Sequence, residues 1–439
     1  MSRPPSDDKA YPLDIDNLSA RTADRPVAIP PNLPCYTPSV TAHRYTDSHI
    51  YPNLHTNVEA SVMEYSGADE KIPAVRTGWS IGLHGSDTPF RHHEVIAGYV
   101  EGLFSRKGYT NLVEYGTTVE LAVKDQEANK WILTLRKPGG GDKSGLDYWW
   151  TATFDALVVA SGKYHVPYIP PIPGLKEFAE RYPGCVEHAK QYRGPAKYKD
   201  KKLVTVGASV SAADTAVSLI NTAKHPIYAI VRGKYNIYFG DEAFKHPAIE
   251  RRALITNIDS ENGTRAVHLQ DGTSISDVDH LIFGTGFTWT LPFLPSIPIR
   301  NNRVPDLYLH IFHQSDPTLV FLGAVGAGLT FKVFEWQAVA AARVLAGKAT
   351  LPPLSEQKRW EEERIKAKGD GAGFMMVFPD FEGYFEQLRA IAGEPQDGKG
   401  RRLPVFEQAW VDEFAKGHER RIRMWRRANE AASGRGSKI

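Results

Sequence analysis

The residues best suited to bind a cofactor form a turn of small side chains between an apolar run and a helical pattern. The apolar run Lys202–Val206 is followed by Gly207, Ser209, Ser211 and Ala212. In a dinucleotide-binding turn, the first small residue permits a sharp bend, the second lets the backbone approach a pyrophosphate, and the third lets the helix pack on the strand. The amide groups at the helix start then face the phosphates. Because serine and alanine replace two glycines of the usual G-x-G-x-x-G pattern, the prediction of a dinucleotide site also depends on the residues that follow.

The end of the next predicted strand carries positive charge. Ile227–Val231 is typical of a second strand, and Arg232 and Lys234 follow it where many such units have an acidic residue. A cation at this place favours the 2′-phosphate of NADPH, whereas an acidic residue favours the ribose hydroxyl of NADH. The residues alone also allow a strand, turn and helix that bind no phosphate and carry a surface arginine.

Two passages of the chain share one design, which is a hairpin pattern, then a short apolar strand, then a small residue before a glycine. The first passage comprises Lys130–Leu135, the turn Gly139–Gly141, Tyr148–Phe154 and Ala156–Ala160 with Ser161 and Gly162; the second comprises Ala266–Leu269, the turn Asp271–Gly272 and Asp279–Gly284 with Thr285 and Gly286. Continuous apolar runs of this length are typical of strands buried in a parallel sheet. The repeat therefore predicts an α/β fold with two related nucleotide-binding units.

Composition limits the classes of partner. The 439 residues can form two domains, and a formal net charge of +2 gives no overall field that would recruit nucleic acid. Cys35 and Cys185 lie outside any C-x-x-C pattern, which argues against a disulfide scaffold or a zinc site. Thr318–Phe331, the most apolar stretch, is too short for a transmembrane anchor, and the first residues are not a signal peptide. We expect a soluble, cytoplasmic protein with a small-molecule substrate; the sequence leaves a homodimer open.

Three segments lie outside the predicted nucleotide turns. Residues 1–50 are polar, rich in proline and without a sustained period, so they predict a loose or extended arm. Arg91–Arg106 has the spacing of a helix that covers a sheet. Near the end of the chain, a helical pattern carries a basic cluster, which consists of Arg420, Arg421, Arg423, Arg426 and Arg427. This cluster is either the solvated face of a terminal helix or a phosphate-binding or membrane-surface patch.

A family resemblance rests on the segment before the turn. Tyr182–Arg193 resembles the F-x-G-x-x-x-H-x-x-x-(Y/F) signature of flavin-containing monooxygenases, with Gly184, His188 and Tyr192 in register and tyrosine in the first position. It precedes Gly207 by about the interval found in that family. Further segments that resemble the family follow in order, namely Tyr51–Asn57, Phe90–Val95, Phe154–Gly162, Phe283–Phe287, Leu307–Gly323 and Phe334–Ala338. Related Baeyer-Villiger enzymes carry tryptophan in the place of Tyr192, so this departure favours oxygenation at nitrogen or sulfur.

The resemblance implies two Rossmann-like domains, with an NADPH domain inserted into a discontinuous FAD domain. The expected divisions are an arm at 1–50, the first segment of the FAD domain at 51–165, the NADPH domain at 166–283, and the second segment of the FAD domain with a basic helical tail at 284–439. The family begins with a strand and G-x-G-x-x-G turn for the FAD pyrophosphate, and nothing before Tyr51 resembles it. A truncated gene model, completion by another chain, or a degenerate relative that binds flavin poorly would each explain this departure.

The resemblance also implies the chemistry. NADPH reduces FAD, the reduced flavin captures molecular oxygen as a C4a-hydroperoxide, and a soft nucleophile attacks that peroxide. Asn57 is the expected catalytic residue, because an amide can donate a hydrogen bond to the peroxide without transferring a proton; a turn asparagine is the alternative. The expected cofactor contacts are Gly207, Ser209, Ser211, Ala212, Arg232, Lys234, Ser161, Gly162, Thr285, Gly286 and Gln337. For Gln337, a purely structural amide inside a helix is the equal alternative.

Other interpretations of the site residues are less specific. His188 is interpreted as structural, and His92 with His93 has no third ligand at a suitable spacing, so no metal site is predicted. One competing function is a flavin-free or degenerate NADP-binding relative without oxygenase activity. Another is a flavin reductase or NADPH oxidase that releases peroxide.

Overall fold

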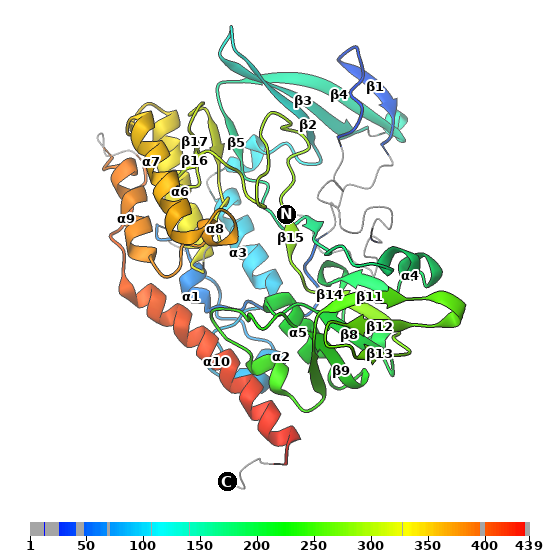
Figure 1. Ribbon diagram of the computed structural model, residues 1–439. Coiled ribbons are helices and arrows are strands. Elements are labelled where there is room, and N and C mark those ends of the chain that lie inside the picture. Colours follow the sequence, from blue (N-terminus) through cyan, green and yellow to red (C-terminus); the bar gives the residue numbers. More distant parts are fainter. Residues whose placement is uncertain are drawn as a thin grey trace.

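The computed structural model (Figure 1) describes residues 13, 26–40, 48–67, 71–106, 108–139, 141–326, 328–395 and 400–434. Most of the predicted arm, at 1–12, 14–25 and 41–47, lies outside these ranges.

A five-stranded parallel sheet contains the predicted dinucleotide turn. In sheet order its strands are β10 (Ile249–Arg252), β9 (Lys224–Ile230), β8 (Lys202–Val206), β14 (His280–Phe283) and β7 (Val186–His188). Helix α5 (Val210–Leu219) buries its alanines on one face of the sheet, while a second apolar cluster covers the other face. Burial on both faces explains why the strands are continuous apolar runs. The predicted strand, turn, helix and second strand are confirmed.

A three-stranded antiparallel sheet connects β10 to β14. It consists of β11 (Ile255–Asp259), β12 (Ala266–Leu269) and β13 (Ser274–Ile275), and α4 (Leu175–Arg181) packs against β11. The predicted turn at Asp271–Gly272 joins β12 to β13, and β14 then enters the parallel sheet. The hairpin pattern and the buried strand that follows it are therefore separate elements.

The second half of the fold uses segments from before and after the parallel sheet. Strand β5 (Leu157–Val159) pairs in parallel with β18 (Leu319–Phe321), beside β17 (Phe312–His313) and β16 (Leu307–Tyr308). A link of two short strands, β6 (Val166–Pro167) and β15 (Phe287–Thr288), joins the two halves. As the repeat predicts, β5 and β14 are both parallel strands that end before a small residue and a glycine.

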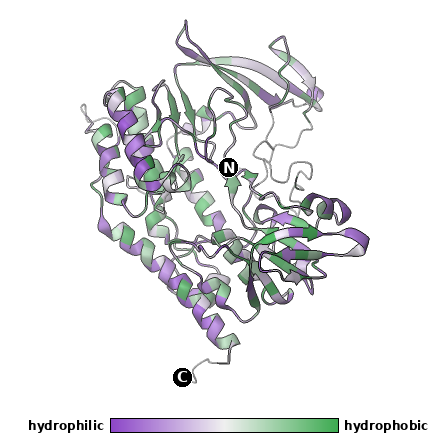
Figure 2. Cartoon of the chain, viewed as in Figure 1, coloured by the Kyte–Doolittle hydropathy of each residue, from purple (hydrophilic) through white to green (hydrophobic). Residues whose placement is uncertain are grey.

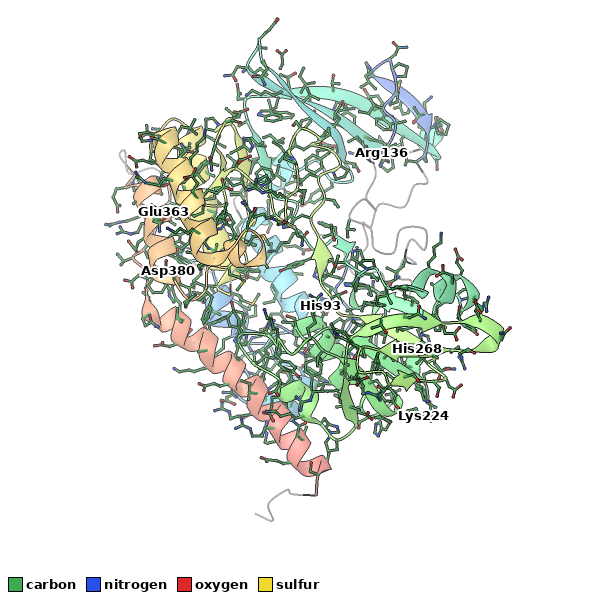
Figure 3. All side chains as sticks on the ribbon, in the orientation of Figure 1. His93, Arg136, Lys224, His268, Glu363 and Asp380 are labelled. Atoms are coloured by element: carbon green, nitrogen blue, oxygen red, sulfur yellow. The ribbon has the colours of Figure 1, made fainter. Side chains whose placement is uncertain are left out.

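An antiparallel sheet lies at the far end of this second half (Figure 1), in the order β1 (Cys35–Pro38), β4 (Leu146–Phe154), β3 (Lys130–Pro138) and β2 (Thr118–Asp125). On β3, Arg136 (Figure 3) forms 2.8 Å ion pairs with Glu120 of β2 and Asp147 of β4, which holds the three strands together. The hairpin β3–β4 is as predicted. Strand β1 is an addition, because the sequence of the arm predicted no regular element there.

Helices cover the remaining faces. They are α1 (Ala60–Met63), α2 (Gly78–His84), α3 (His93–Ser105), α6 (Thr330–Leu345), α7 (Leu354–Lys368), α8 (Ala372–Met375), α9 (Phe381–Ala392) and α10 (Gln408–Ala432). In Figure 1, α10 runs from the α6–α9 group toward the half that holds the parallel sheet, and Figure 2 shows that it is mainly hydrophilic with scattered apolar residues. Within the described ranges, no helix has the length and apolar character needed to span a bilayer.

Helix α10 is only partly a solvated helix. Arg421 is 7% exposed and forms an ion pair with Asp214 of α5, and Trp425 is buried in the apolar core around α5. Interpreting this helix as a fully solvated face is therefore wrong for Arg421, whose partner lies more than 200 positions earlier in the chain.

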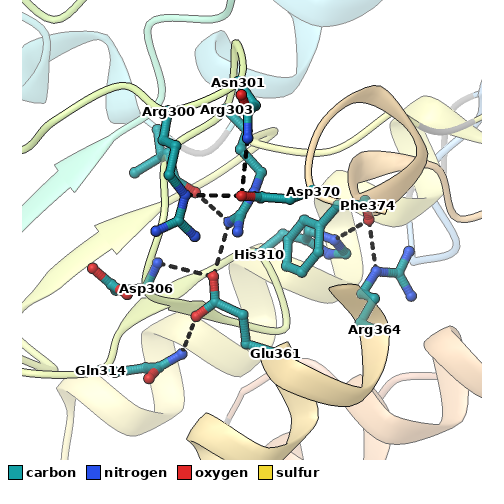
Figure 4. A network of polar contacts seen from close by, with 11 residues as sticks. Arg300, Asn301, Arg303, Asp306, His310, Gln314, Glu361, Arg364, Asp370 and Phe374 are labelled. Carbon is teal, nitrogen blue, oxygen red and sulfur yellow. Dashed lines mark hydrogen bonds and ion pairs between the residues drawn. The ribbon is translucent and has the colours of Figure 1, made fainter. Parts of the chain in front are cut away.

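A buried ionic network fixes α7 to the segment before β16 (Figure 4). Arg303 pairs with Glu361 at 2.9 Å and with Asp370 at 2.5 Å, and Arg300 reaches the other oxygen of Asp370 at 2.9 Å. Glu361 also accepts hydrogen bonds from Gln314 and from the amide of Asp306. Both oxygens of Glu361 thus accept hydrogen bonds from protein groups, and the network has a structural role.

Candidate cofactor site

The turn after β8 is tight because two glycines let the backbone of α5 approach β14. Gly207 has a φ of +126°, and a Cβ at this residue would lie 2.5 Å from the carbonyl oxygen of Gly284. A Cβ on Gly284 would lie 2.6 Å from the backbone of Ala212. The amide of Gly207 donates to the carbonyl of Ile230 at 3.0 Å, which fixes the turn at the end of β9. Small residues are therefore required where the sequence places them.

The start of α5 presents backbone donors. Ser209 is the N-cap residue, but its side chain caps no amide and instead accepts a 3.3 Å hydrogen bond from Asn236. The first amides of a helix have no acceptor within the helix, and Ser211 and Ala212 lie in this first turn. With the exposed Ser209, these amides form a helix N-terminus of the kind that binds a pyrophosphate.

Two cations follow β9. Arg232 and Lys234 are both exposed, and within the described residues neither has a carboxylate within 4.0 Å. Since they stand at the carboxyl end of the second strand, they are placed to pair with a 2′-phosphate. The chemistry of this donor set fits NADPH.

The second predicted turn follows β5. Ser161 accepts a 2.6 Å hydrogen bond from His165 on its backbone oxygen, and Gly162 has a φ of +76°. The next residue, Lys163, donates to the carbonyl of Val325 at 3.1 Å, and burial lowers the pKa of its amine to about 8. Sequence reasoning missed Lys163; its position directly after Gly162 was the available signal.

Thr285 and Gly286 form hydrogen bonds with the segment that links the two halves. The hydroxyl of Thr285 donates to the carbonyl of Tyr168, and the amide of Tyr168 donates back to Gly286 at 2.9 Å. These contacts tie the end of β14 to the segment after β6. The pair therefore positions the connection between the two sheets, and its direct contact with a cofactor stays a prediction.

Gln337 is fully buried in α6, and both ends of its amide have partners. Its oxygen accepts from the amide of Gly323 and its nitrogen donates to the hydroxyl of Tyr384, each at 2.9 Å. Gly323 closely follows β18, so Gln337 holds the loop that leads into α6. These bonds match the structural alternative for this residue, and a contact with flavin stays a prediction.

Asn57 lies in a segment that touches both halves. In this segment the ring of His49 packs on Phe287 and the ring of Tyr51 packs on Tyr192, with 5.9 and 5.7 Å between the ring centroids. The backbone amide of Thr56 donates a hydrogen bond to the backbone carbonyl of Arg91 at 2.8 Å. Asn57 itself is half-buried, and no hydrogen bond of its side chain is formed within the described ranges. Its amide is therefore available to a ligand.

His188 acts as a structural residue. Its Nδ1 accepts from the amide of Lys190 at 3.1 Å, and its ring packs edge-on against Phe287 at 5.1 Å. Burial lowers the pKa of His188 to about 3, so the ring is neutral. His92 similarly caps the start of α3, and in the described ranges no group of three or more metal-binding side chains gathers.

Comparison with known proteins agrees with this geometry. Residues 151–310 match the family described as pyridine nucleotide-disulphide oxidoreductase, and residues 249–394 match flavin-binding monooxygenase-like proteins. The flavin-containing monooxygenase iboF of Amanita muscaria is 30% identical over 348 residues, which is 69% of this chain and 64% of that protein. This chain belongs to the flavin-containing monooxygenase family.

Other members extend the comparison. Trimethylamine monooxygenase of Methylocella silvestris is 29% identical, over 65% of this chain and 61% of that protein. The chain thus spans less than two thirds of the length of these two curated flavin-containing monooxygenases. The structure of S-allyl-L-cysteine S-oxygenase from Allium sativum has a TM-score of 0.67 at 23% identity, covering 89% of this chain and 85% of that one. The two-unit α/β fold is therefore that of solved flavin-containing monooxygenases.

The sheet that contains β5 differs at one edge from the sheet that contains β14. Strand β14 has a parallel neighbour on each edge, whereas β5 has β18 on one edge and no strand from the described residues on the other. Val158 of β5 is 42% exposed. By the internal repeat, a strand and turn for the FAD pyrophosphate would lie along this edge. Such a turn is not among the described residues, and a flavin contact at Ser161 and Gly162 stays a prediction.

Proposed function

We propose that this chain is an NADPH- and FAD-dependent monooxygenase that oxygenates a small molecule at nitrogen or sulfur with molecular oxygen. The close packing of Gly207, Ala212 and Gly284, with cations after β9, is the observation that carries the proposal, because a turn of this kind suits the pyrophosphate and 2′-phosphate of NADPH. The names of two relatives, a trimethylamine monooxygenase and a cysteine S-oxygenase, support nitrogen or sulfur as the reacting atom.

The roles of the chain's own residues follow from their placement. The start of α5 binds the pyrophosphate of NADPH, and Arg232 and Lys234 bind its 2′-phosphate. When bound, FAD supplies the redox and oxygen chemistry. Asn57 offers a neutral amide that can donate a hydrogen bond without transferring a proton. We place the division between the units at residues 166–283 for the NADPH domain, and the two free cysteines support a cytoplasmic location.

One edge of β5 has no strand partner among the described residues, which favours a second candidate function, an NADP-binding relative that does not oxygenate. In that case the chain would bind NADPH through the Gly207 turn and would take up no flavin.

The full chain, purified and incubated with FAD, distinguishes these functions. The monooxygenase should become yellow, consume oxygen with NADPH when trimethylamine or a thioether is added, and release the corresponding oxide. Protein that binds NADPH but retains no FAD would support the second candidate. Retained FAD with hydrogen peroxide as the sole product would identify an NADPH oxidase.

A further inference from the structure

A cavity of about 290 Å³ between α2 and α10 is lined almost entirely by basic side chains. The lining residues are His84, Arg420, Arg423, Arg426, Arg427 and Glu430. None of them belongs to the cofactor turns, and neither the family resemblance nor the proposed oxygenation uses them.

The helix geometry places the cations together. Arg420, Arg423 and Arg427 are three and four positions apart, so they lie on one face of α10. The neighbouring face of the same helix is fixed by the ion pair of Arg421 with Asp214 and by the burial of Trp425. The helix backbone that carries these arginines is therefore fixed at this position.

The carboxylates around the cavity do not balance these cations. Asp87 pairs with both terminal nitrogens of Arg420 at 2.9 Å, and Glu242 is 3.9 Å from Arg426. Among the residues that the structure describes, Arg423 and Arg427 have no carboxylate within 4.0 Å, although Glu430 also lines the cavity.

Some of the cluster has a structural explanation. Arg420 and Arg427 donate to the carbonyls of His84 and Leu83, both at 2.9 Å, and so cap the end of α2. Arg423 caps nothing within the described residues, so the capping of α2 does not account for its presence in the cavity.

His84 lines the cavity beside these arginines. Its Nδ1 is enclosed by protein and has no hydrogen-bond partner within the described residues, so this atom does not face the cavity. Burial, together with the positive charges of Arg421, Arg420 and Arg427, lowers the pKa of His84 to about 4. The ring is thus a neutral group among positive charges, and it leaves the cavity's charge to the arginines.

We infer that this cavity binds a phosphate group, with Arg423 as the principal contact and Arg427 and His84 beside it. Guanidinium groups match phosphate oxygens in geometry and charge. Because α10 also contacts α5 through Arg421 and Asp214, a bound phosphate would stabilise the helix that bridges the two units. The phosphate could belong to a soluble anion or to a lipid headgroup, which share this chemistry.

Calorimetric titration of the full chain with inorganic phosphate tests the inference. The titration is made at constant ionic strength with chloride and with saturating NADP⁺, so that the turn after β8 is occupied. We expect binding that Arg423→Ala weakens at least tenfold and that Arg423→Lys partly restores. The matched control is Arg402→Ala, an exposed arginine paired with Glu394, which should leave binding unchanged.

A second titration identifies the source of the phosphate. Phosphatidylcholine vesicles with and without phosphatidylinositol 4-phosphate are added to the same variants. Binding to the phosphoinositide vesicles that depends on Arg423 would indicate a lipid headgroup, and binding to free phosphate alone would indicate a soluble anion. If neither ligand binds, or if Arg423→Ala binds as tightly as the wild-type chain, the inference is overturned.

Discussion

Gly284 packs against Ala212 so closely that an added Cβ on the glycine would lie 2.6 Å from the backbone nitrogen and Cα of the alanine. This contact joins the end of β14 to the first turn of α5. It explains why both positions carry the smallest side chains, and why the carboxyl end of β14 and the dinucleotide turn form one structure.

Gly284→Ala should therefore destabilise the chain. The neighbouring atoms are backbone, which cannot move aside as a flexible side chain could, so we expect a loss of about 1–3 kcal/mol in the free energy of unfolding. NADPH affinity should fall as well, because the start of α5 is displaced. Denaturant unfolding and fluorescence titration with NADPH measure both effects. Gly82→Ala in α2 is the control, because a Cβ there meets nothing within 4 Å; an equal loss in both variants would contradict the argument.

The preference for NADPH over NADH should depend on the cations after β9. Replacing both Arg232 and Lys234 with alanine removes charge-assisted contacts worth about 1.5–3 kcal/mol each, so NADPH affinity should fall by more than tenfold. NADH has no 2′-phosphate, and its affinity should change little. Lys224→Ala, at the opposite end of the same strand (Figure 3), serves as the matched control. Equal weakening of NADPH and NADH would argue against a 2′-phosphate contact.

The sequence predicted those elements whose formation depends on residues that are close together in the chain. The apolar runs of β8, β9 and β14 and the small residues at Gly207 are recognisable because each strand is buried on both faces and each turn restricts side-chain size. Helix α3 begins two residues after the predicted start, Arg91, and ends one residue before the predicted end, Arg106.

Features that depend on distant partners could not be predicted. Strand β1 is four residues long, begins directly after Pro34 and ends at Pro38, and pairs with β4 more than 100 positions later. The burial of Arg421 depends on Asp214, and the orientation of the Gln337 amide depends on Gly323 and Tyr384. In each case the residue type is visible in the sequence, but the partner that decides its role is not.

Acid should destabilise the chain partly through His188. Its pKa is lowered by burial to about 3 from a usual value of 6.5, so between these values the unfolded state binds more protons than the folded state. The stability that is present above pH 6.5 is therefore lost as the pH falls, with a slope of up to about 1.4 kcal/mol per pH unit from this residue. Asn can accept the amide of Lys190 without titrating, so His188→Asn should flatten the slope measured by urea unfolding between pH 6.5 and 4.

The control for this measurement is His268→Asn, which changes a half-buried histidine on β12. A slope that falls equally in both variants would show that the effect is not specific to the buried ring of His188. A His188→Asn variant that kept the full slope would show that other groups cause the acid sensitivity.

Asn57→Ala should uncouple NADPH consumption from oxygenation. If the amide donates a hydrogen bond in the site, its loss corresponds to about 1–1.5 kcal/mol, or roughly tenfold less oxygenated product per NADPH, with a matching rise in hydrogen peroxide. The ratio of oxide to peroxide measures the effect. Asn53→Ala changes an exposed asparagine four positions earlier and should leave this ratio unchanged. An unchanged ratio for Asn57→Ala would indicate that the residue only forms a turn.

Two arginines that share Asp370 test how burial changes the contribution of an ion pair to the free energy of unfolding (Figure 4). Arg303 is 1% exposed on its side chain and Arg300 is 49% exposed, yet both are within 3 Å of the same carboxylate. Removing Arg303 leaves Glu361 buried without its cation, so Arg303→Ala should cost about 3–5 kcal/mol in the free energy of unfolding. Arg300→Ala removes a solvent-screened pair and should cost less than about 1 kcal/mol. Denaturant unfolding of the two variants under identical conditions compares them directly, and similar losses would mean that Glu361 finds a replacement partner, such as a proton or water, when Arg303 is absent.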